Sequence, residues 1–167
     1  MYNEAKLIIL RGNSGSGKST TAKLLQRKFG RGTLVIPQDI IRREMLWVKD
    51  EMGTKAISLL IELAKYGKQN CNIVILEGIL YSDLYQELFE VLKLEFNNIY
   101  AYYFDIPFEE TLARHQTKPN CDQFGENEMK RWWREKDYIR IISEKRITNE
   151  LSLEEIVDII FLDVTSK

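Results

Sequence analysis

The feature that most constrains this chain is the glycine-rich segment Gly12-Asn13-Ser14-Gly15-Ser16-Gly17-Lys18-Ser19. Its spacing is G-x-x-x-x-G-K-S, in which glycines allow a tightly curled backbone that points several N–H groups toward a phosphate group. A continuous apolar run at 6–10 precedes the loop, and apolar residues at helical spacing follow it over 18–29. This order of strand, loop and helix predicts a phosphate-binding loop at the end of a buried strand.

Within this loop, two side chains indicate that the phosphates belong to a nucleoside triphosphate. Lys18 is placed to reach the β- and γ-phosphates, and the Ser19 hydroxyl is placed to ligate a magnesium ion that bridges them. The predicted cofactors are therefore ATP and Mg²⁺. The residues expected to bind the nucleotide are Gly12, Asn13, Ser14, Gly15, Ser16, Gly17, Lys18, Ser19 and Thr20, together with the more distant Lys118.

Strand-like and helix-like patterns alternate along the rest of the chain. Short apolar runs predict strands at 34–36, 73–78 and 99–104. Apolar residues at helical spacing predict helices at 40–47, 54–67, 82–96, 108–115, 129–142 and 153–161, the last opened by a capping box of Ser152 and Glu155. Such alternation is typical of an α/β fold in which helices cover both faces of a parallel sheet.

The composition is that of an ordinary globular protein. With 167 residues, of which 44% are apolar, we expect a single domain over 1–167. The 24 basic and 25 acidic residues give a net charge of -1, which argues against broad electrostatic binding of nucleic acid. The two cysteines and the absence of a long apolar run favour a cytoplasmic protein without a membrane partner. No pattern predicts the oligomeric state.

Asp39 and Arg42 form a candidate site outside the loop. Asp39 follows the predicted strand 34–36, whose carboxyl end should face the same crevice as the phosphate-binding loop in an open α/β sheet. There Asp39 could accept the proton of an acceptor hydroxyl, and Arg42, three residues later on the same helical face, could orient the acceptor. The alternative is a helix cap followed by a surface arginine.

Glu77, at the end of the predicted strand 73–78, is the candidate metal ligand alongside Ser19. A carboxylate at the end of a central strand can hold a magnesium-bound water molecule or an acceptor group. The same side chain could equally be solvated or cap a neighbouring element.

The polar stretch 116–126 is predicted to be a mobile loop within a helical lid that spans about 114–137. A closing lid would bring cations onto the transferring phosphates, and Arg114 and Lys118 are the preferred candidates. His115 is interpreted as a surface residue rather than a catalyst. Four other lid residues could bind ligand or could only be solvated or packed: Arg131, Trp132, Trp133 and Arg134.

These motifs resemble the P-loop kinases of the nucleoside-monophosphate-kinase group, particularly the 5′-kinase domain of phage polynucleotide kinase and the zeta-toxin and chloramphenicol-phosphotransferase-like enzymes. The resemblance rests on 12–20, on the step from Asp39 to Arg42, and on Phe104-Asp105-Ile106-Pro107 followed by Arg114 and Lys118. It implies a three-layer α/β/α fold with a five-stranded parallel sheet in the order 2-3-1-4-5. It also implies that Asp39 is the general base, that Arg42 contacts the acceptor and that Arg114 contacts the donor phosphates.

The sequence thus predicts an ATP-dependent phosphotransferase that moves the γ-phosphoryl group to a hydroxyl of a small molecule, a nucleotide or a polynucleotide end. Its predicted catalytic residues are Lys18, Asp39, Arg42 and Arg114. The alternative is an ATP-dependent switch or binding module, in which nucleotide orders the lid for a partner and no acceptor is phosphorylated. Nucleic acid would be a partner only as a substrate with a free 5′-hydroxyl. No motif identifies the acceptor.

Overall fold

A parallel sheet of five strands forms the centre of the computed structural model, which describes residues 4–166. The strands are β1 (Lys6–Gly12), β2 (Leu34–Pro37), β3 (Ile73–Gly78), β4 (Asn98–Phe104) and β5 (Glu144–Ile147). Their order is β2-β3-β1-β4-β5, and each neighbouring pair is parallel. The predicted fold class and strand order are therefore confirmed.

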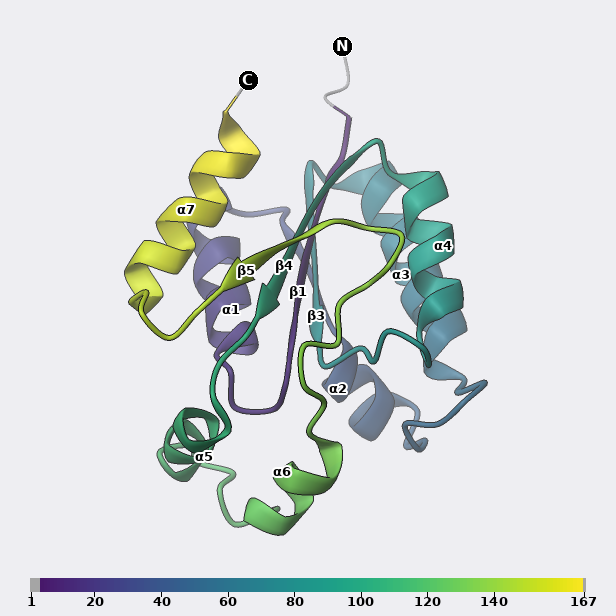
Figure 1. The fold of residues 1–167 in the computed structure, drawn as a ribbon. Coiled ribbons are helices and arrows are strands. Elements are labelled where there is room, and N and C mark those ends of the chain that lie inside the picture. Colours follow the sequence, from purple (N-terminus) through teal and green to yellow (C-terminus); the bar gives the residue numbers. More distant parts are fainter. Residues whose placement is uncertain (1–3, 167) are drawn as a thin grey trace.

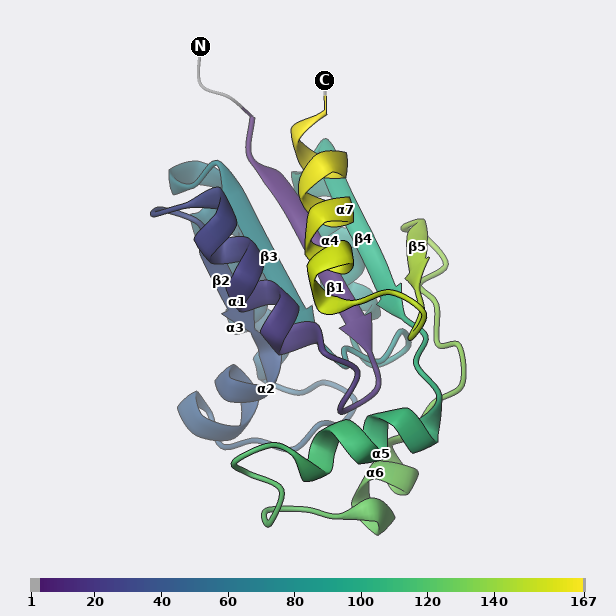
Figure 2. The ribbon, with the colours of Figure 1, turned by 90° about the vertical axis from the view of Figure 1, so that its left-hand side faces the viewer.

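Helices cover both faces of this sheet. The helices are α1 (Lys18–Phe29), α2 (Gln38–Ile40), the π-helical turn η1 (Ile41–Met45), α3 (Ala56–Asn70), α4 (Gln86–Glu95), α5 (Phe108–Gln116), α6 (Glu126–Trp132) and α7 (Leu153–Thr165). Figures 1 and 2 show α1 and α7 on one face and α3 and α4 on the other. The three layers follow from short βα connections, which return the chain to the sheet after each strand.

The alternation of side chains along β1 shows why the sheet is buried on both faces. Leu7 and Ile9 pack in one cluster with residues of α3 and α4, whereas Ile8 and Leu10 pack in a second cluster with residues of α1 and α7. All four side chains are fully buried. A continuous apolar run is therefore required at this strand, because each of its faces contacts a helical layer.

The carboxyl ends of the strands lie at one edge of the sheet, and the polar elements of the chain gather there. Figure 1 shows α2, α5 and α6 beyond this edge, away from the main helical layers. The phosphate-binding loop leaves β1 at the same edge. The topology thus brings the loop, the segment after β2 and the predicted lid together.

The predicted helix over 129–142 is wrong from residue 133 onward. Helix α6 ends at Trp132, and the chain then runs without regular structure to β5. The cause is tertiary, because the buried guanidinium of Arg11 forms ion pairs with Asp137 and Glu144 and holds this segment across the end of the sheet. β5 itself reads Glu-Lys-Arg-Ile, so no apolar pattern marks it as a strand.

His115 is also placed differently from the prediction. Its side chain is 2% exposed, its ring stacks on Phe124 at a centroid distance of 4.2 Å, and its Nε2 is 2.7 Å from the Phe124 carbonyl oxygen. It packs the inside of the predicted lid and is not a surface residue.

Within 4–166, no helix has both the length and the apolar character that crossing a membrane requires.

Candidate functional site

The glycine-rich loop wraps tightly between β1 and α1. Gly15 and Gly17 have φ values of 79° and 99°, in the left-handed region that glycine adopts without strain. A Cβ on Gly15 would lie 2.5 Å from the carbonyl oxygen of Thr111 in α5. The glycine therefore allows the loop to pack directly against the first helix of the predicted lid.

Lys18 lies inside this loop. Its Nζ donates hydrogen bonds to the carbonyl oxygen of Asn13 at 2.8 Å and to the Ser16 hydroxyl at 3.2 Å. Burial lowers the pKa of Lys18 to about 8, although the nearby carboxylate of Glu77 acts in the opposite direction. The ammonium group is thus held where a phosphate would lie, with poor solvation that an anionic ligand would compensate.

The pKa of Lys18 predicts how nucleotide affinity depends on pH. Below about pH 8 the lysine is charged before ATP binds; above it, binding must take up a proton, because phosphate oxygens stabilise the charged form. We expect the Kd for ATP to be nearly constant from pH 7 to 7.5 and to rise by up to about tenfold per pH unit above pH 8. Calorimetry at pH 8.5 in two buffers of different ionisation enthalpy measures this proton uptake.

Two variants serve as controls for this effect. Lys18→Arg keeps its charge over the whole range, so it should lose the part of the pH dependence that comes from Lys18. Burial also lowers the pKa of Lys118, and Lys118→Gln separates its contribution. A wild-type Kd that is constant to pH 9.5 would contradict the assignment of Lys18 to the phosphates.

Ser19 and Glu77, the two predicted metal ligands, are in direct contact. The Ser19 hydroxyl donates to Glu77 Oε1 at 2.9 Å, and Glu77 is 6% exposed at the end of β3. Burial raises the pKa of Glu77, while the charge of Lys18 and the hydrogen bond from Ser19 act to lower it. A carboxylate that is partly compensated in this way, beside a hydroxyl, is a suitable donor set for a hard cation.

The donor set fits magnesium held mainly by its substrate. Among residues 4–166, no group of three or more His, Cys, Asp or Glu side chains is arranged to hold a metal ion. Magnesium usually takes one or two protein oxygens and completes its shell with water and substrate phosphates. Ser19 and Glu77 supply two such oxygens next to Lys18, so the residues present fit a metal ion that arrives with ATP.

Asp39 and Arg42 lie at the start of α2 and in η1, respectively. Arg42 Nη2 donates to Asp39 Oδ1 at 3.0 Å, and Arg43 Nη1, which sequence reasoning missed, donates to Asp39 Oδ2 at 3.4 Å. The Asp39 side chain is 58% exposed. It makes no helix-capping hydrogen bond, so the alternative of a cap with a surface arginine does not describe this pair.

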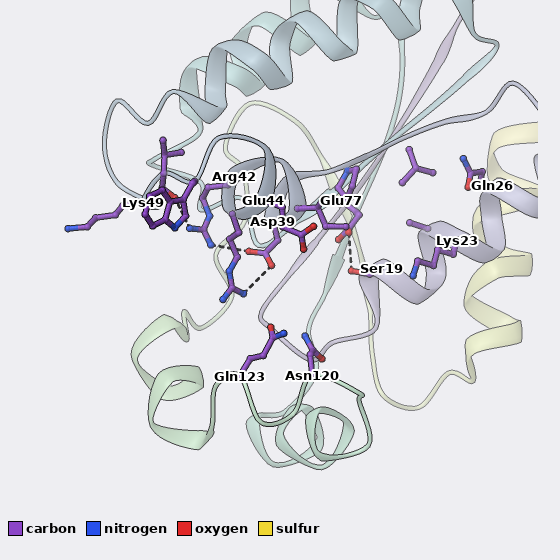
Figure 3. A pocket seen from close by; sticks show the side chains of 17 residues that line it. Ser19, Lys23, Gln26, Asp39, Arg42, Glu44, Lys49, Glu77, Asn120 and Gln123 are labelled. Carbon is purple, nitrogen blue, oxygen red and sulfur yellow. Dashed lines mark hydrogen bonds and ion pairs between the residues drawn. The ribbon is translucent and has the colours of Figure 1, made fainter.

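One cavity joins the candidate metal ligands to the Asp39–Arg42 pair. Its volume is about 1130 Å³, and Ser19, Glu77, Asp39 and Arg42 all line it. Figure 3 shows Asn120 and Gln123 projecting from the predicted lid toward this group from the opposite side. Polar residues in the loop 116–126 were expected, but nothing in their order indicated which of them face the cavity.

A smaller cavity, of about 290 Å³, is lined by residues 15–17 of the loop and by Arg114 and Lys118. Arg114 Nη1 donates to the carbonyl oxygen of Ser16 at 3.1 Å, so its guanidinium lies against the loop. Leu151, Leu153 and Ile156 form an apolar wall of this cavity. Sequence reasoning missed the wall, because Leu153 and Ile156 match the pattern of an ordinary amphipathic helix and Leu151 lies just before it.

The predicted lid is anchored to the phosphate-binding loop at both of its ends. At the first end Arg114 binds Ser16, as described above. At the second, the Asn13 side-chain amide donates to the backbone oxygen of Arg134 at 2.7 Å and accepts from its backbone nitrogen at 3.0 Å. Tyr81 donates to the Trp132 carbonyl oxygen at 2.7 Å. Only the middle of the lid is therefore free of these anchors.

The four basic and aromatic lid residues with open roles have different environments. The Arg131 side chain is 72% exposed and pairs with Glu128, so it lies on a solvated face. The Arg134 guanidinium lies 4.1 Å from the centre of the Tyr81 ring and pairs with Asp83. Trp132 and Trp133 pack edge-on against Phe124 and Phe108, respectively. Both tryptophans are packed in this way and neither lines the cavities that contain Asp39 or Arg114, although Trp133 lines a separate cavity of about 560 Å³ with Asp105 and Arg146.

Known structures share this architecture. An APS kinase from Mycobacterium tuberculosis, solved in complex with AMPPNP and APS, is 21% identical over 98% of this chain and 99% of that chain, with a TM-score of 0.69. A shikimate kinase from Acinetobacter baumannii in complex with shikimate is 17% identical over 99% and 96%, with a TM-score of 0.65. A gluconokinase from Sinorhizobium meliloti is 15% identical over 98% and 93%, with a TM-score of 0.64. These likenesses establish the fold.

The sequence comparisons give the family. No curated protein matches the chain. The narrower resemblance to polynucleotide 5′-kinase, zeta-toxin and chloramphenicol-phosphotransferase-like enzymes stays a prediction. A family model described as an AAA domain matches residues 7–139, which include the phosphate-binding loop, Asp39, Glu77 and most of the predicted lid. Because that match extends over most of the sequence, the chain belongs to the AAA domain family.

Proposed function

We propose that this protein is a kinase that transfers the γ-phosphoryl group of ATP to a hydroxyl group of an acceptor. The observation that carries the proposal is the arrangement of two cavities around the phosphate-binding loop. The smaller has an apolar wall suited to a nucleoside, and the larger contains the carboxylate of Asp39. Separate spaces for donor and acceptor that meet at the phosphates are what direct transfer requires.

On the donor side, the chain's own groups position and neutralise the triphosphate. We assign to phosphate binding the loop 12–20, the Lys18 ammonium and, from the predicted lid, Arg114 and Lys118. Ser19 and Glu77 would hold a magnesium ion, which would reduce the negative charge of the phosphates. The cations lie within or against the loop, so they can stabilise the charge that spreads over the γ-phosphoryl oxygens during transfer.

On the acceptor side, Asp39 is the proposed general base and Arg42 orients it. As the acceptor oxygen forms its bond to the γ-phosphorus, the bond from that phosphorus to the β–γ bridging oxygen breaks, and the hydroxyl proton passes to Asp39. The products are ADP and a phosphorylated acceptor. The exposure of the Asp39 carboxylate leaves it accessible to a hydroxyl, while its ion pair with Arg42 fixes its direction.

The proposal is tested by the effect of acceptors on ADP formation. Candidate hydroxyl compounds (nucleosides, nucleotides, sugars, aminoglycosides and 5′-hydroxyl oligonucleotides) are added to the protein with ATP and Mg²⁺. We expect at least one class to raise the rate of ADP formation well above the rate with water alone, and saturably. A slow ATP hydrolysis that no class stimulates, combined with a protein partner that binds only in ATP, would favour the switch alternative.

A further inference from the structure

The larger cavity has a feature that the transfer chemistry does not use. The inference from this feature rests on the proposed function and narrows the class of acceptor. We infer that Trp47, together with the neighbouring cations Arg43 and Lys49, selects acceptors that carry both a planar aromatic ring and an anionic group. All three residues line the same cavity as Asp39. The inference therefore concerns which hydroxyl compound is placed against the base.

Trp47 is exposed to solvent in a strained backbone conformation, and packing within the chain does not explain this unfavourable placement. Its side chain is 91% exposed, and its backbone has a φ of 51°, in the left-handed region that L side chains rarely adopt. Burial normally stabilises a tryptophan strongly, and strained backbone in folded proteins gathers at ligand sites. An exposed indole at the wall of a cavity is thus a candidate surface for stacking with a planar ligand.

Arg42 fixes the turn that presents Trp47 through two hydrogen bonds with the backbone of Val48. The backbone nitrogen of Val48 donates to the carbonyl oxygen of Arg42 at 3.0 Å, and Arg42 Nη1 donates to the carbonyl oxygen of Val48 at 3.1 Å. Arg42 also binds Asp39. The position of the indole is therefore tied to the position of the proposed base, and a ring stacked on it has a defined relation to Asp39.

Positive charge predominates at this end of the cavity. Arg42, Arg43 and Lys49 line it beside Trp47, against Asp39 and Glu44 of opposite sign. Asp39 pairs with both arginines. Within 4–166, the contact with Asp39 is the one hydrogen bond that the Arg43 side chain makes, so the other N–H groups of the Arg43 guanidinium can bind a ligand. Arginine donors of this kind favour carboxylate or phosphate groups.

The size of the cavity agrees with an acceptor of this class. Its volume of about 1130 Å³ is slightly above the roughly 300–1,000 Å³ that is usual for small-molecule sites. Figure 3 shows Ser19 and Glu77 on one side of Asp39 and Lys49 on the other. Space therefore remains for a ring in addition to the phosphoryl group and the reacting hydroxyl.

The test compares acceptors that contain an aromatic ring with related acceptors that lack one. One pair is 4-(hydroxymethyl)benzoate with 4-(hydroxymethyl)cyclohexanecarboxylate, and the other is AMP with ribose 5-phosphate. Binding to the full chain with ADP and Mg²⁺ is measured by calorimetry. Because stacking on an aromatic side chain is worth about fivefold to a hundredfold in affinity, we expect the aromatic member of at least one pair to bind tighter by that factor.

Variants assign the preference to the indole. Trp47→Ala should abolish the difference within the pair without weakening the non-aromatic member, and Trp47→Phe should retain part of it. Met52→Ala, at a side chain that is 72% exposed but does not line the cavity, should leave the preference intact. Arg43→Gln and Lys49→Gln should each weaken both members and reduce the salt dependence of binding.

Failure of this inference and failure of the kinase proposal give different results. Absence of a preference in both pairs, or its survival in Trp47→Ala, overturns the inference, whether or not an acceptor is phosphorylated. If Trp47 affects only oligonucleotides and not AMP, the site binds a strand, and the small-acceptor inference is wrong. If Trp47-dependent binding occurs without any phosphoryl transfer, the selectivity stands and the kinase proposal fails.

Discussion

Replacement of Asp39 by asparagine is expected to lower kcat for acceptor phosphorylation by about 10²- to 10⁴-fold, the range of a positioned general base. Asparagine has the same shape and keeps an oxygen that can accept a hydrogen bond from Arg42, so the ion-paired turn should remain folded. It cannot take up the acceptor's proton. The loop that holds ATP is formed by other residues, so the Kd for ATP should change by less than about threefold. Steady-state kinetics with a saturating acceptor measures the first effect, and calorimetry the second.

Asp158→Asn is the matched control for this substitution. Asp158 lies on α7, where its exposed carboxylate pairs with Lys28, and it lines neither cavity. Its loss should leave kcat unchanged. If Asp39→Asn retained more than about a tenth of the wild-type kcat, Asp39 would not be the base, and a side chain elsewhere in the cavity would have to accept the proton.

Replacement of Arg11 by leucine is expected to lower the free energy of unfolding by about 3–5 kcal/mol, the usual effect of removing one partner from a buried ion pair. The Arg11 side chain is fully buried and binds both carboxylate oxygens of Glu144 at 2.9 and 3.0 Å and Asp137 Oδ2 at 3.1 Å. Its Nε donates to the carbonyl oxygen of Leu80 at 3.0 Å. Leucine would leave the Glu144 carboxylate, which is 1% exposed, without its cation.

Urea denaturation of the variants tests this expectation. Arg11→Lys keeps the charge but not the two-bond geometry with Glu144, so it should lose less stability than Arg11→Leu. Arg131→Leu, at a side chain that is 72% exposed, should change stability by less than about 0.5 kcal/mol. A loss of under 1 kcal/mol for Arg11→Leu would show that the network does not hold the segment before β5 in place.

The sequence was informative wherever local pattern and function coincide. The loop 12–19 contains its glycines because its backbone must curl, and β1 and β3 are continuous apolar runs because both of their faces are covered. Motif and strand order together placed Glu77 and Asp39 at one edge of the sheet, where the structure brings both into one cavity. The contact between Ser19 and Glu77 follows from the same topology.

The remaining features depend on contacts between residues far apart in the chain. β5 has only one buried apolar residue, and its strand conformation depends on β4 and on Arg11, which precedes it by more than 130 residues. No local pattern predicts the hydrogen bonds between Asn13 and the backbone of Arg134, because these residues are 121 positions apart. Trp47 fits a helical pattern, yet η1 ends at Met45, and the backbone of Trp47 has a positive φ that leaves its indole exposed.

The central claim is that the γ-phosphoryl group passes directly to a hydroxyl acceptor next to Asp39. Its most direct test follows the label from γ-³²P-labelled ATP, with Mg²⁺ and each acceptor class present, and separates labelled acceptor from labelled inorganic phosphate. The account predicts that most of the label released from ATP is in the acceptor with wild-type protein and that this product disappears with Asp39→Asn. Label found only in inorganic phosphate, at the same rate in both proteins, would contradict it.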